Sequence, residues 1–166
     1  MAKGEIILLA DDDADDVLLV RMALKEAGFE NPIFVVCDGQ EAIQYLSGEG
    51  LYADRAQFPV PQLLLLDLKM PQMTGFEVLA WLRQRREWNG LPVVILTGSC
   101  YEPEVKHAYE LGANSFLTKP SDFSAFVGTM KQMAHFWLGK ARLPETTPIF
   151  PRELRRATPP PPGKGP

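Results

Sequence analysis

The stretch LLLLDLKMP, residues 63–71, places Asp67 directly behind four leucines. A run in which every position is apolar is typical of a strand buried on both faces of a parallel sheet. The carboxylate therefore stands at the carboxyl end of a buried strand, which is where parallel α/β sheets bind their ligands. An aspartate that only begins the next turn would occupy the same place. The residues at the ends of the other strands therefore distinguish a ligand-binding Asp67 from a turn residue.

Four more apolar runs alternate with amphipathic segments along the chain. Strands are expected at 5–10, 32–36, 62–67, 92–97 and 115–118, and helices at 14–28, 39–47, 74–87, 102–113 and 121–137. Gly28 and Gly112 stand where helix ends favour a left-handed residue, and Ser121 suits the N-cap of the last helix. This order predicts an α/β fold, a doubly wound five-stranded parallel sheet flanked by five helices.

Composition and charge divide the chain into two parts. The 166 residues are 46% hydrophobic and 23% charged, which is typical of one globular domain. Residues 1–139 hold 11 Lys and Arg against 19 Asp and Glu, whereas residues 140–166 hold 6 against 2 and eight of the fifteen prolines. We expect a folded domain over 1–143 and a Pro-rich, basic, disordered tail over 144–166.

The same features narrow the location and the partners. The sequence has neither an apolar run near the ~20 residues of a membrane span nor a signal peptide, so we expect a cytoplasmic protein without membrane contact. The acidic domain repels nucleic acid, and residues 144–166 are too few for a DNA-binding fold, so no nucleic-acid partner is expected. Cys37 and Cys100 lack metal-ligand spacing and are predicted to be reduced packing residues.

Polar residues gather at the predicted strand ends. The first strand leads into Asp11 and Asp12, the third into Asp67, the fourth ends at Thr97, and Lys119 follows the fifth. Two carboxylates ~4 Å apart repel by about 4 kcal/mol at an effective dielectric of 20, and a hard divalent cation such as Mg²⁺ removes that conflict. Lys119 could then contact a phosphate oxygen, and Asp67 could carry a phosphoryl group as an acyl phosphate.

These motifs resemble the receiver domains of two-component response regulators over about residues 5–138. The resemblance rests on the pair Asp11-Asp12, LLLLDLKMPQMTG around Asp67, ILTGS at Thr97 and GANSFLTKP with Lys119, in the order of the family. It implies a flavodoxin-like receiver fold and a single-domain regulator. Such a regulator accepts a phosphoryl group from a histidine kinase and switches protein–protein interactions in a phosphorelay, without acting as an enzyme on other substrates.

The resemblance also implies a role for each matching residue. Asp67 is the phosphoacceptor, and Mg²⁺ is held by Asp11, Asp12, Asp67 and the backbone carbonyl of Lys69. Thr97 and Lys119 bind the phosphoryl oxygens. As the switch, the phosphoryl group draws in the Thr97 hydroxyl and the aromatic side chain of Phe116 swings inward. The peptide bond between Lys119 and Pro120 is a candidate for the cis form. The residues to which the resemblance assigns a role are Asp11, Asp12, Asp67, Lys69, Thr97, Phe116, Lys119 and Pro120.

A narrower resemblance concerns the regulators paired with bacterial phytochrome-like histidine kinases. It rests on the long connection at 48–62, on Lys69, on TGS after the fourth strand and on the FWL ending. It implies a phytochrome-like kinase partner. Many members of the wider family dimerise, and the apolar last helix is compatible with a homodimer through the face of the last helix and strand. Lys69 and Ser99 stand where the family controls access of hydrolytic water, so we expect a long-lived acyl phosphate.

Three other interpretations stay open at this point. Asp11 to Asp16 would also suit a solvated helix N-terminus, because acidic groups are favoured there. A pseudo-receiver would keep the fold and bind partners without accepting phosphate. A haloacid-dehalogenase-like phosphatase also uses an aspartyl phosphate, but that family needs a second aspartate two residues after the first, where this chain has Lys69.

Overall fold

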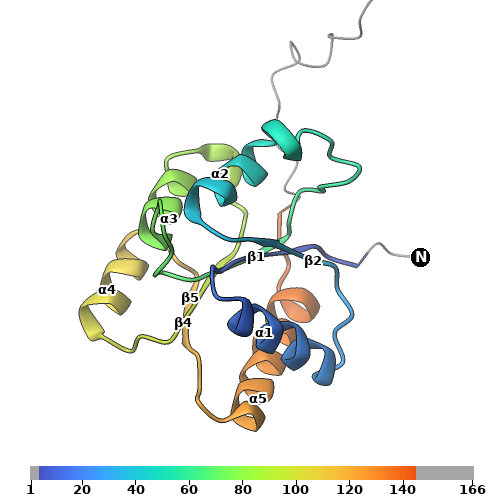
Figure 1. Ribbon diagram of the computed structural model, residues 1–166, viewed down its shortest axis with the longest axis vertical. Helices are drawn as coiled ribbons and strands as arrows, with labels where there is room; N and C mark the ends of the chain where they lie inside the picture. The colour runs from blue at the N-terminus through green and yellow to red at the C-terminus, as the bar shows by residue number, and fades with distance from the viewer. Residues whose placement is uncertain (1–3, 145–166) are drawn as a thin grey trace, which may run out of the picture.

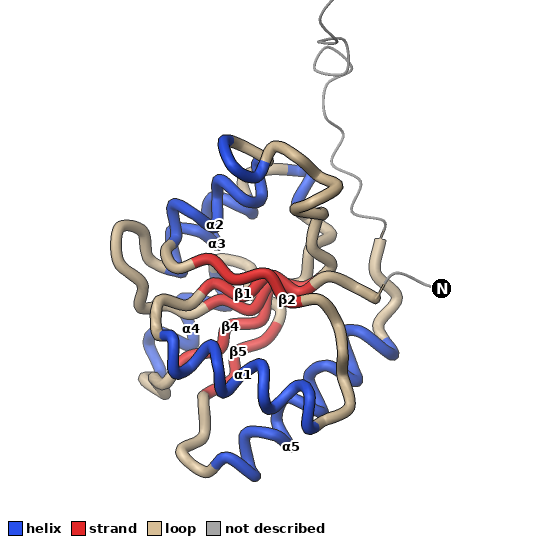
Figure 2. The backbone as a smooth tube through the Cα atoms, turned by 45° about the vertical axis from the view of Figure 1, so that its right-hand side comes forward, coloured by secondary structure: helices blue, strands red, loops and turns tan. Residues whose placement is uncertain are grey.

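The computed structural model describes residues 4–144, which form a sheet with helices on both faces (Figures 1 and 2). The strand order is β2-β1-β3-β4-β5, and every neighbouring pair is parallel. The chain moves outward from β1 to β2 and then crosses back to β3, so the order reverses between β1 and β3. The predicted five-stranded parallel sheet is confirmed. Its strands are β1 (Ile7–Ala10), β2 (Ile33–Val36), β3 (Leu63–Leu66), β4 (Val93–Thr97) and β5 (Ser115–Thr118).

The helices cover the two faces of the sheet. Figure 2 shows α2 and α3 on one side of the strands and α1 and α5 on the other. The predicted helices are confirmed, although the helix expected over 74–87 ends at Arg83 and is followed by a short 3₁₀ turn, and α5 continues into a π-helical turn. They are α1 (Ala14–Glu26), α2 (Gly39–Ser47), α3 (Gly75–Arg83), α4 (Glu102–Glu110) and α5 (Phe123–Ala134), with η1 (Gly50–Tyr52), η2 (Arg86–Trp88) and η3 (His135–Lys140).

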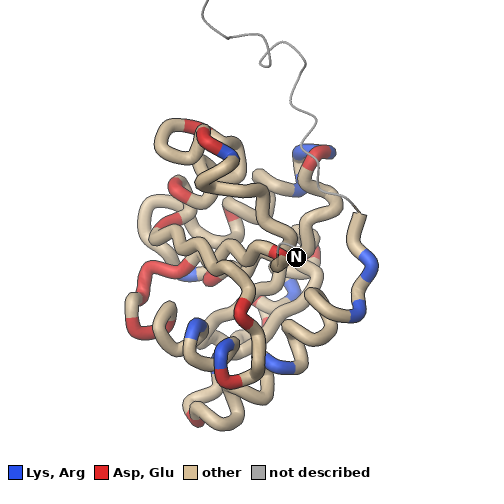
Figure 3. Tube along the Cα trace, turned by 90° about the vertical axis from the view of Figure 1, so that its right-hand side faces the viewer, with Lys and Arg blue, Asp and Glu red and all other residues tan. Residues whose placement is uncertain are grey.

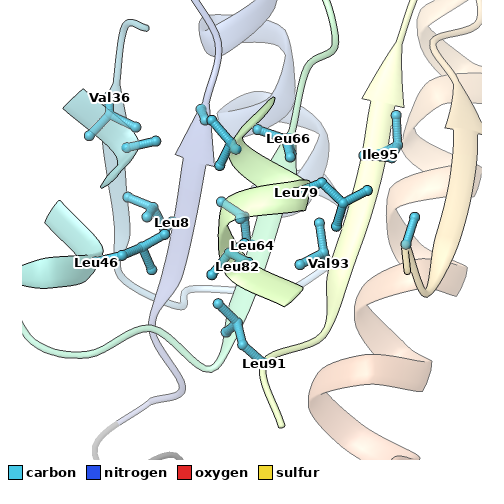
Figure 4. Packing of buried hydrophobic residues seen from close by; sticks show 14 of the residues in the cluster. Leu8, Val36, Leu46, Leu64, Leu66, Leu79, Leu82, Leu91, Val93 and Ile95 are labelled. Carbon is cyan, nitrogen blue, oxygen red and sulfur yellow. The ribbon is translucent and has the colours of Figure 1, made fainter. Parts of the chain in front are cut away.

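The four leucines of β3 explain why this strand is apolar throughout. Leu64 and Leu66 belong to the core layer under α2 and α3 (Figure 4), whereas Leu63 and Leu65 belong to the layer under α1 and α5. All four side chains are 0% exposed. Because fully burying a leucine is worth roughly 1.5–3 kcal/mol, the strand that carries Asp67 at its end is firmly fixed.

The connection at 48–62 is ordered by one arginine and two aromatic rings. Arg55 donates hydrogen bonds to the carbonyl oxygens of Tyr45 (2.7 Å) and Leu46 (2.6 Å) in the last turn of α2. Its guanidinium therefore satisfies carbonyl groups at the end of this helix. The rings of Tyr52 and Phe58 pack edge to face with centroids 5.0 Å apart. The long connection is therefore a packed part of the domain.

Two predictions about local packing are wrong. Cys37 and Cys100 are free but exposed, because both lie outside the strands: Cys37 directly follows β2, and Cys100 lies in the loop after β4. The N-cap of α5 is Asp122 and not Ser121, because the Asp122 carboxylate accepts a hydrogen bond from the N–H of Ala125 (2.7 Å). A carboxylate satisfies this donor while also favouring the positive end of the helix.

The last predicted helix buries its apolar side only in part. Phe126 and Met130 are buried in the core layer under α1 and α5, whereas Phe123 remains 37% exposed.

No helix within residues 4–144 is long and apolar enough to cross a membrane. The last described residues, 140–144, carry only basic charge (Figure 3), and the predicted tail over 144–166 lies outside the described residues except for Pro144.

Candidate functional site

The carboxyl ends of the strands bring the predicted polar residues to one edge of the sheet. Asp11 follows β1, and its N–H donates to the carbonyl oxygen of Val36 (3.0 Å). Asp67 follows β3, and its N–H donates to that of Ala10 (2.9 Å). These bonds extend the parallel hydrogen-bond ladders by one residue. The backbone therefore fixes the positions from which the side chains of Asp11 and Asp67 project. Within residues 4–144, the buried polar or charged residues are Asp11, Asp67 and Thr97.

Three carboxylates lie close enough to share a cation. Oxygen atoms of Asp11, Asp12 and Asp67 lie within 4.8 Å of one another. Asp11 is 1% and Asp67 is 8% exposed, whereas Asp12 is exposed to solvent. Oxygen-only donors of this kind suit a hard divalent cation that keeps some of its water ligands, and the exposed Asp12 leaves room for them.

Lys119 lies among the carboxylates. Its Nζ donates to Asp11 Oδ2 (2.7 Å) and Asp16 Oδ2 (2.7 Å), and it lies 3.5 Å from Asp67 Oδ2. Burial alone would lower the pKa of Lys119, but the hydrogen bonds to Asp11 and Asp16 raise it above its usual value, so the ammonium stays charged. Burial raises the pKa of Asp11, and the contact with Lys119 opposes this shift.

Asp16 is the site residue that the sequence analysis missed. The run of acids from Asp11 to Asp16 was open to interpretation as a helix cap, and Asp13 does act as one. Its carboxylate accepts from the N–H groups of Asp15 (2.8 Å) and Asp16 (3.2 Å). The acids of this run therefore have different roles. Asp16 lies three residues after the cap residue Asp13, and side chains at this spacing are neighbours on one helix face, which was the available signal that Asp16 faces the site.

The predicted acceptor Asp67 is the first residue of the loop between β3 and α3. The N–H of Lys69 donates to Asp67 Oδ1 (3.3 Å), while the Lys69 side chain is exposed. Thr74 and Glu77 form a reciprocal capping box that begins α3. The carboxylate of Asp67 is thus oriented from its own loop, and the metal-binding role of the Lys69 carbonyl stays a prediction.

The predicted switch residues occupy the neighbouring edge. Thr97 is 1% exposed at the end of β4, and Lys119 pairs with it through a backbone hydrogen bond (2.8 Å). Phe116 is partly buried against the core layer under α2 and α3, and its N–H donates to the hydroxyl of Tyr109 on α4 (3.0 Å). Ser99 is partly buried, and its carbonyl oxygen lies 3.5 Å from the Thr118 hydroxyl.

The prediction of a cis bond before Pro120 is wrong for this structure. No peptide bond within residues 4–144 is cis, so the bond between Lys119 and Pro120 is trans. The trans form of such bonds is favoured by about 0.5–1 kcal/mol. With this bond trans, Lys119 contacts the carboxylates of Asp11, Asp16 and Asp67.

Comparison with known proteins identifies the family. The sequence profile of the response regulator receiver domain matches residues 7–131, so the chain belongs to this family. It is 35% identical over 140 residues to the response regulator Rcp1 of a Synechocystis species, covering 84% of this chain and 93% of Rcp1. These matches agree with the four motifs and with the arrangement of the strand ends.

Solved structures give the same result. The structure of the phosphorylated cyanobacterial phytochrome response regulator RcpA has a TM-score of 0.78 and 36% identity, covering 84% of this chain and 98% of RcpA. The Mn²⁺-bound form of Rcp1 has a TM-score of 0.76 and 35% identity, covering 84% and 99%. The response regulator RPA3017, from red-light signalling in R. palustris, has a TM-score of 0.80 and 32% identity, covering 84% and 98%.

Proposed function

We propose that this receiver domain accepts a phosphoryl group on Asp67 from a sensor histidine kinase. The observation that carries the proposal is the position of Asp67, whose carboxylate lies within 4.8 Å of those of Asp11 and Asp12 and 3.5 Å from the Lys119 ammonium. Transfer breaks the N–P bond of a phosphohistidine and forms an O–P bond at Asp67. Later attack by water breaks that bond and restores the carboxylate.

The negative charge of the transferred group requires compensation at this edge of the sheet. Asp11, Asp12, Asp67 and the Lys69 carbonyl would hold Mg²⁺, which neutralises charge on phosphoryl oxygens when it is bound. Mn²⁺ is bound in the Rcp1 structure, which supports a divalent cation of this kind. Lys119 supplies a fixed positive charge for one phosphoryl oxygen, and the hydroxyl of Thr97 supplies a hydrogen bond.

The output is a change in protein–protein contacts. We assign the switch to Thr97 and Phe116, because Phe116 already packs on the core layer and is tied to α4 through Tyr109. Movement of either residue would then shift α4 and β5. It would thereby change the contacts of a homodimer formed through the face of β5 and α5. The likeness to RcpA favours a phytochrome-like kinase as the partner, and the two free cysteines fit a cytoplasmic location.

Intact mass spectrometry after incubation with acetyl phosphate and Mg²⁺ tests the proposal. The parent chain should gain the mass of one phosphoryl group, and Asp67→Asn should gain none. Asp54→Asn is the matched control, because Asp54 is an exposed aspartate of the 48–62 connection. No gain in the parent, with cation binding shown separately by titration, would favour a pseudo-receiver instead.

A further inference from the structure

Lys119 lies nearer to Asp16 than to the predicted phosphoacceptor. The distance from Nζ is 2.7 Å to Asp16 Oδ2 and 3.5 Å to Asp67 Oδ2. The Asp16 side chain is 34% exposed, compared with 1% for Asp11 and 11% for Lys119. Asp16 thus joins the site from its solvent side, in the first turn of α1.

The geometry of the ammonium leaves one donor for the reacting group. A lysine ammonium has three N–H donors, and Asp11 and Asp16 each accept one at 2.7 Å. The third donor is available for the Asp67 side of the site, where the distance is longer. A phosphoryl oxygen added to Asp67 would extend toward this donor, so Lys119 can keep its contact with Asp16 while it binds the new group.

The three carboxylates around Lys119 differ in what else they have to do. Asp11 and Asp67 belong to the group that would share a cation, together with Asp12, and Asp16 does not. Asp11 would share its charge with a bound cation, and phosphorylation would replace the carboxylate charge of Asp67 with the charge of the phosphoryl oxygens. Asp16 is then the one of the three whose full negative charge remains directed at Lys119.

We propose that Asp16 is a positioning residue that holds the Lys119 ammonium beside Asp67 during phosphoryl transfer. This inference rests on the proposed function of the same site. Within the described residues no hydrogen bond or ion pair joins Asp16 to Asp67, so Asp16 acts through its contact with Lys119. Its place in the first turn of α1, next to the cap residue Asp13, gives the lysine a fixed anchor.

The test compares Asp16→Ala with Asp15→Ala. Both aspartates lie in the first turn of α1, so both changes alter the helix terminus alike, but Asp15 is exposed. With acetyl phosphate and Mg²⁺, we expect acyl phosphate formation to slow by roughly threefold to tenfold in Asp16→Ala, the effect of a partly exposed charge-assisted hydrogen bond. Asp15→Ala should match the parent, and Asp16→Glu should recover part of the rate.

A double-mutant cycle separates positioning from a general structural effect. In a Lys119→Met background, Asp16→Ala should change the rate by less than about twofold, because its partner is already gone. An equal slowing with and without Lys119 would overturn the proposal, and so would equal rates for Asp16→Ala and Asp15→Ala.

The ammonium signal of Lys119 in ¹⁵N-resolved NMR gives a readout that needs no phosphorylation. The Nζ protons should exchange slowly in the parent and in Asp15→Ala, and at least about threefold faster in Asp16→Ala. This measurement decides the matter if Lys119→Met reacts too slowly to follow, and unchanged exchange would overturn the proposal. A parent chain that shows this exchange pattern but gains no phosphoryl group would contradict the proposed function instead.

Discussion

Gly75, the first residue of α3, lies directly against the carbonyl group of Asp67. A β-carbon at Gly75 would overlap the Asp67 carbonyl oxygen and would come within 2.9 Å of the Leu68 Cα. The N–H of Gly75 also donates to the carbonyl oxygen of Leu68 (3.0 Å). The start of α3 therefore fixes the backbone that carries the predicted phosphoacceptor, and this contact requires glycine.

Replacing Gly75 with alanine should damage both the fold and the site. Relief of the overlap must move backbone atoms, which typically costs about 1–3 kcal/mol of the free energy of unfolding. Urea unfolding measures the loss, and phosphorylation by acetyl phosphate should be slower in the folded variant. Gly128→Ala in α5 is the control, because its β-carbon would meet nothing within 4 Å, and stability there should hold or rise. Equal stabilities for the two variants would contradict the close approach.

Asp11→Asn should stabilise the cation-free protein at neutral pH. Burial raises the pKa of Asp11, so the folded state holds its proton more tightly than the unfolded chain does. The ionised Asp11 therefore lowers the free energy of unfolding at pH values above the ordinary carboxyl pKa of about 3.9. This loss of stability disappears as the pH falls from the raised pKa to the ordinary one. We expect the variant to have a higher free energy of unfolding than the parent at pH 7 and to match the parent near pH 3.

Added Mg²⁺ should reverse that order. A ligand at a hundred times its Kd stabilises the folded state by about 2.7 kcal/mol, and Asp11→Asn loses one carboxylate ligand. Thermal unfolding with and without Mg²⁺ measures the difference. A variant that gains as much stability as the parent would show that Asp11 does not hold the cation.

Lys69→Ala should shorten the life of the acyl phosphate. The Lys69 side chain is exposed two residues after Asp67, where it can restrict the approach of water to the phosphoryl group. We expect hydrolysis to accelerate by at least about twofold once that barrier is removed. The loss of phosphorylated protein over time, followed by intact mass, is the measurement. Lys106→Ala on α4 is the control, and a lifetime equal to the parent's in both variants would refute the role of Lys69.

Arg83→Ala should lower stability without involving the site chemistry. The guanidinium at the end of α3 donates to three backbone carbonyl groups and to Asn114 Oδ1 (2.9 Å). Losing these partly buried contacts should cost about 2–4 kcal/mol in urea unfolding. Arg86→Ala changes an exposed arginine nearby and should stay within about 0.5 kcal/mol of the parent. If both variants unfold alike, Arg83 does not tie these segments together.

Much of the fold was predictable because the apolar runs are short and the helical segments are well separated. The four leucines before Asp67 belong to a strand buried on both faces, and the pattern indicates this directly. The positions of the outer strands in the sheet were harder to predict, since β2 and β5 are only partly buried at its edges. Composition does not distinguish a central strand from an edge strand, which depends on the order of pairing.

The contacts of the site depend on distances that a linear pattern does not contain. The strand ends indicated that Asp11, Asp67 and Lys119 would lie together, because parallel strands end at one edge. The contact of Asp16 with Lys119 joins residues 103 positions apart and depends on how the first turn of α1 faces the sheet. The hydrogen bond from Phe116 to Tyr109 depends in the same way on how α4 lies beside β5.

Chemical location of the phosphoryl group tests the central claim most directly. Borohydride reduces an acyl phosphate to an alcohol, so treated protein should contain homoserine where the phosphoryl group was attached. After incubation with acetyl phosphate and Mg²⁺, peptide mapping should find homoserine at position 67 and aspartate at positions 11, 12 and 16. Homoserine at another position, or a stable phosphoryl group with Asp67 unreduced, would contradict the assignment of Asp67 as the phosphoacceptor.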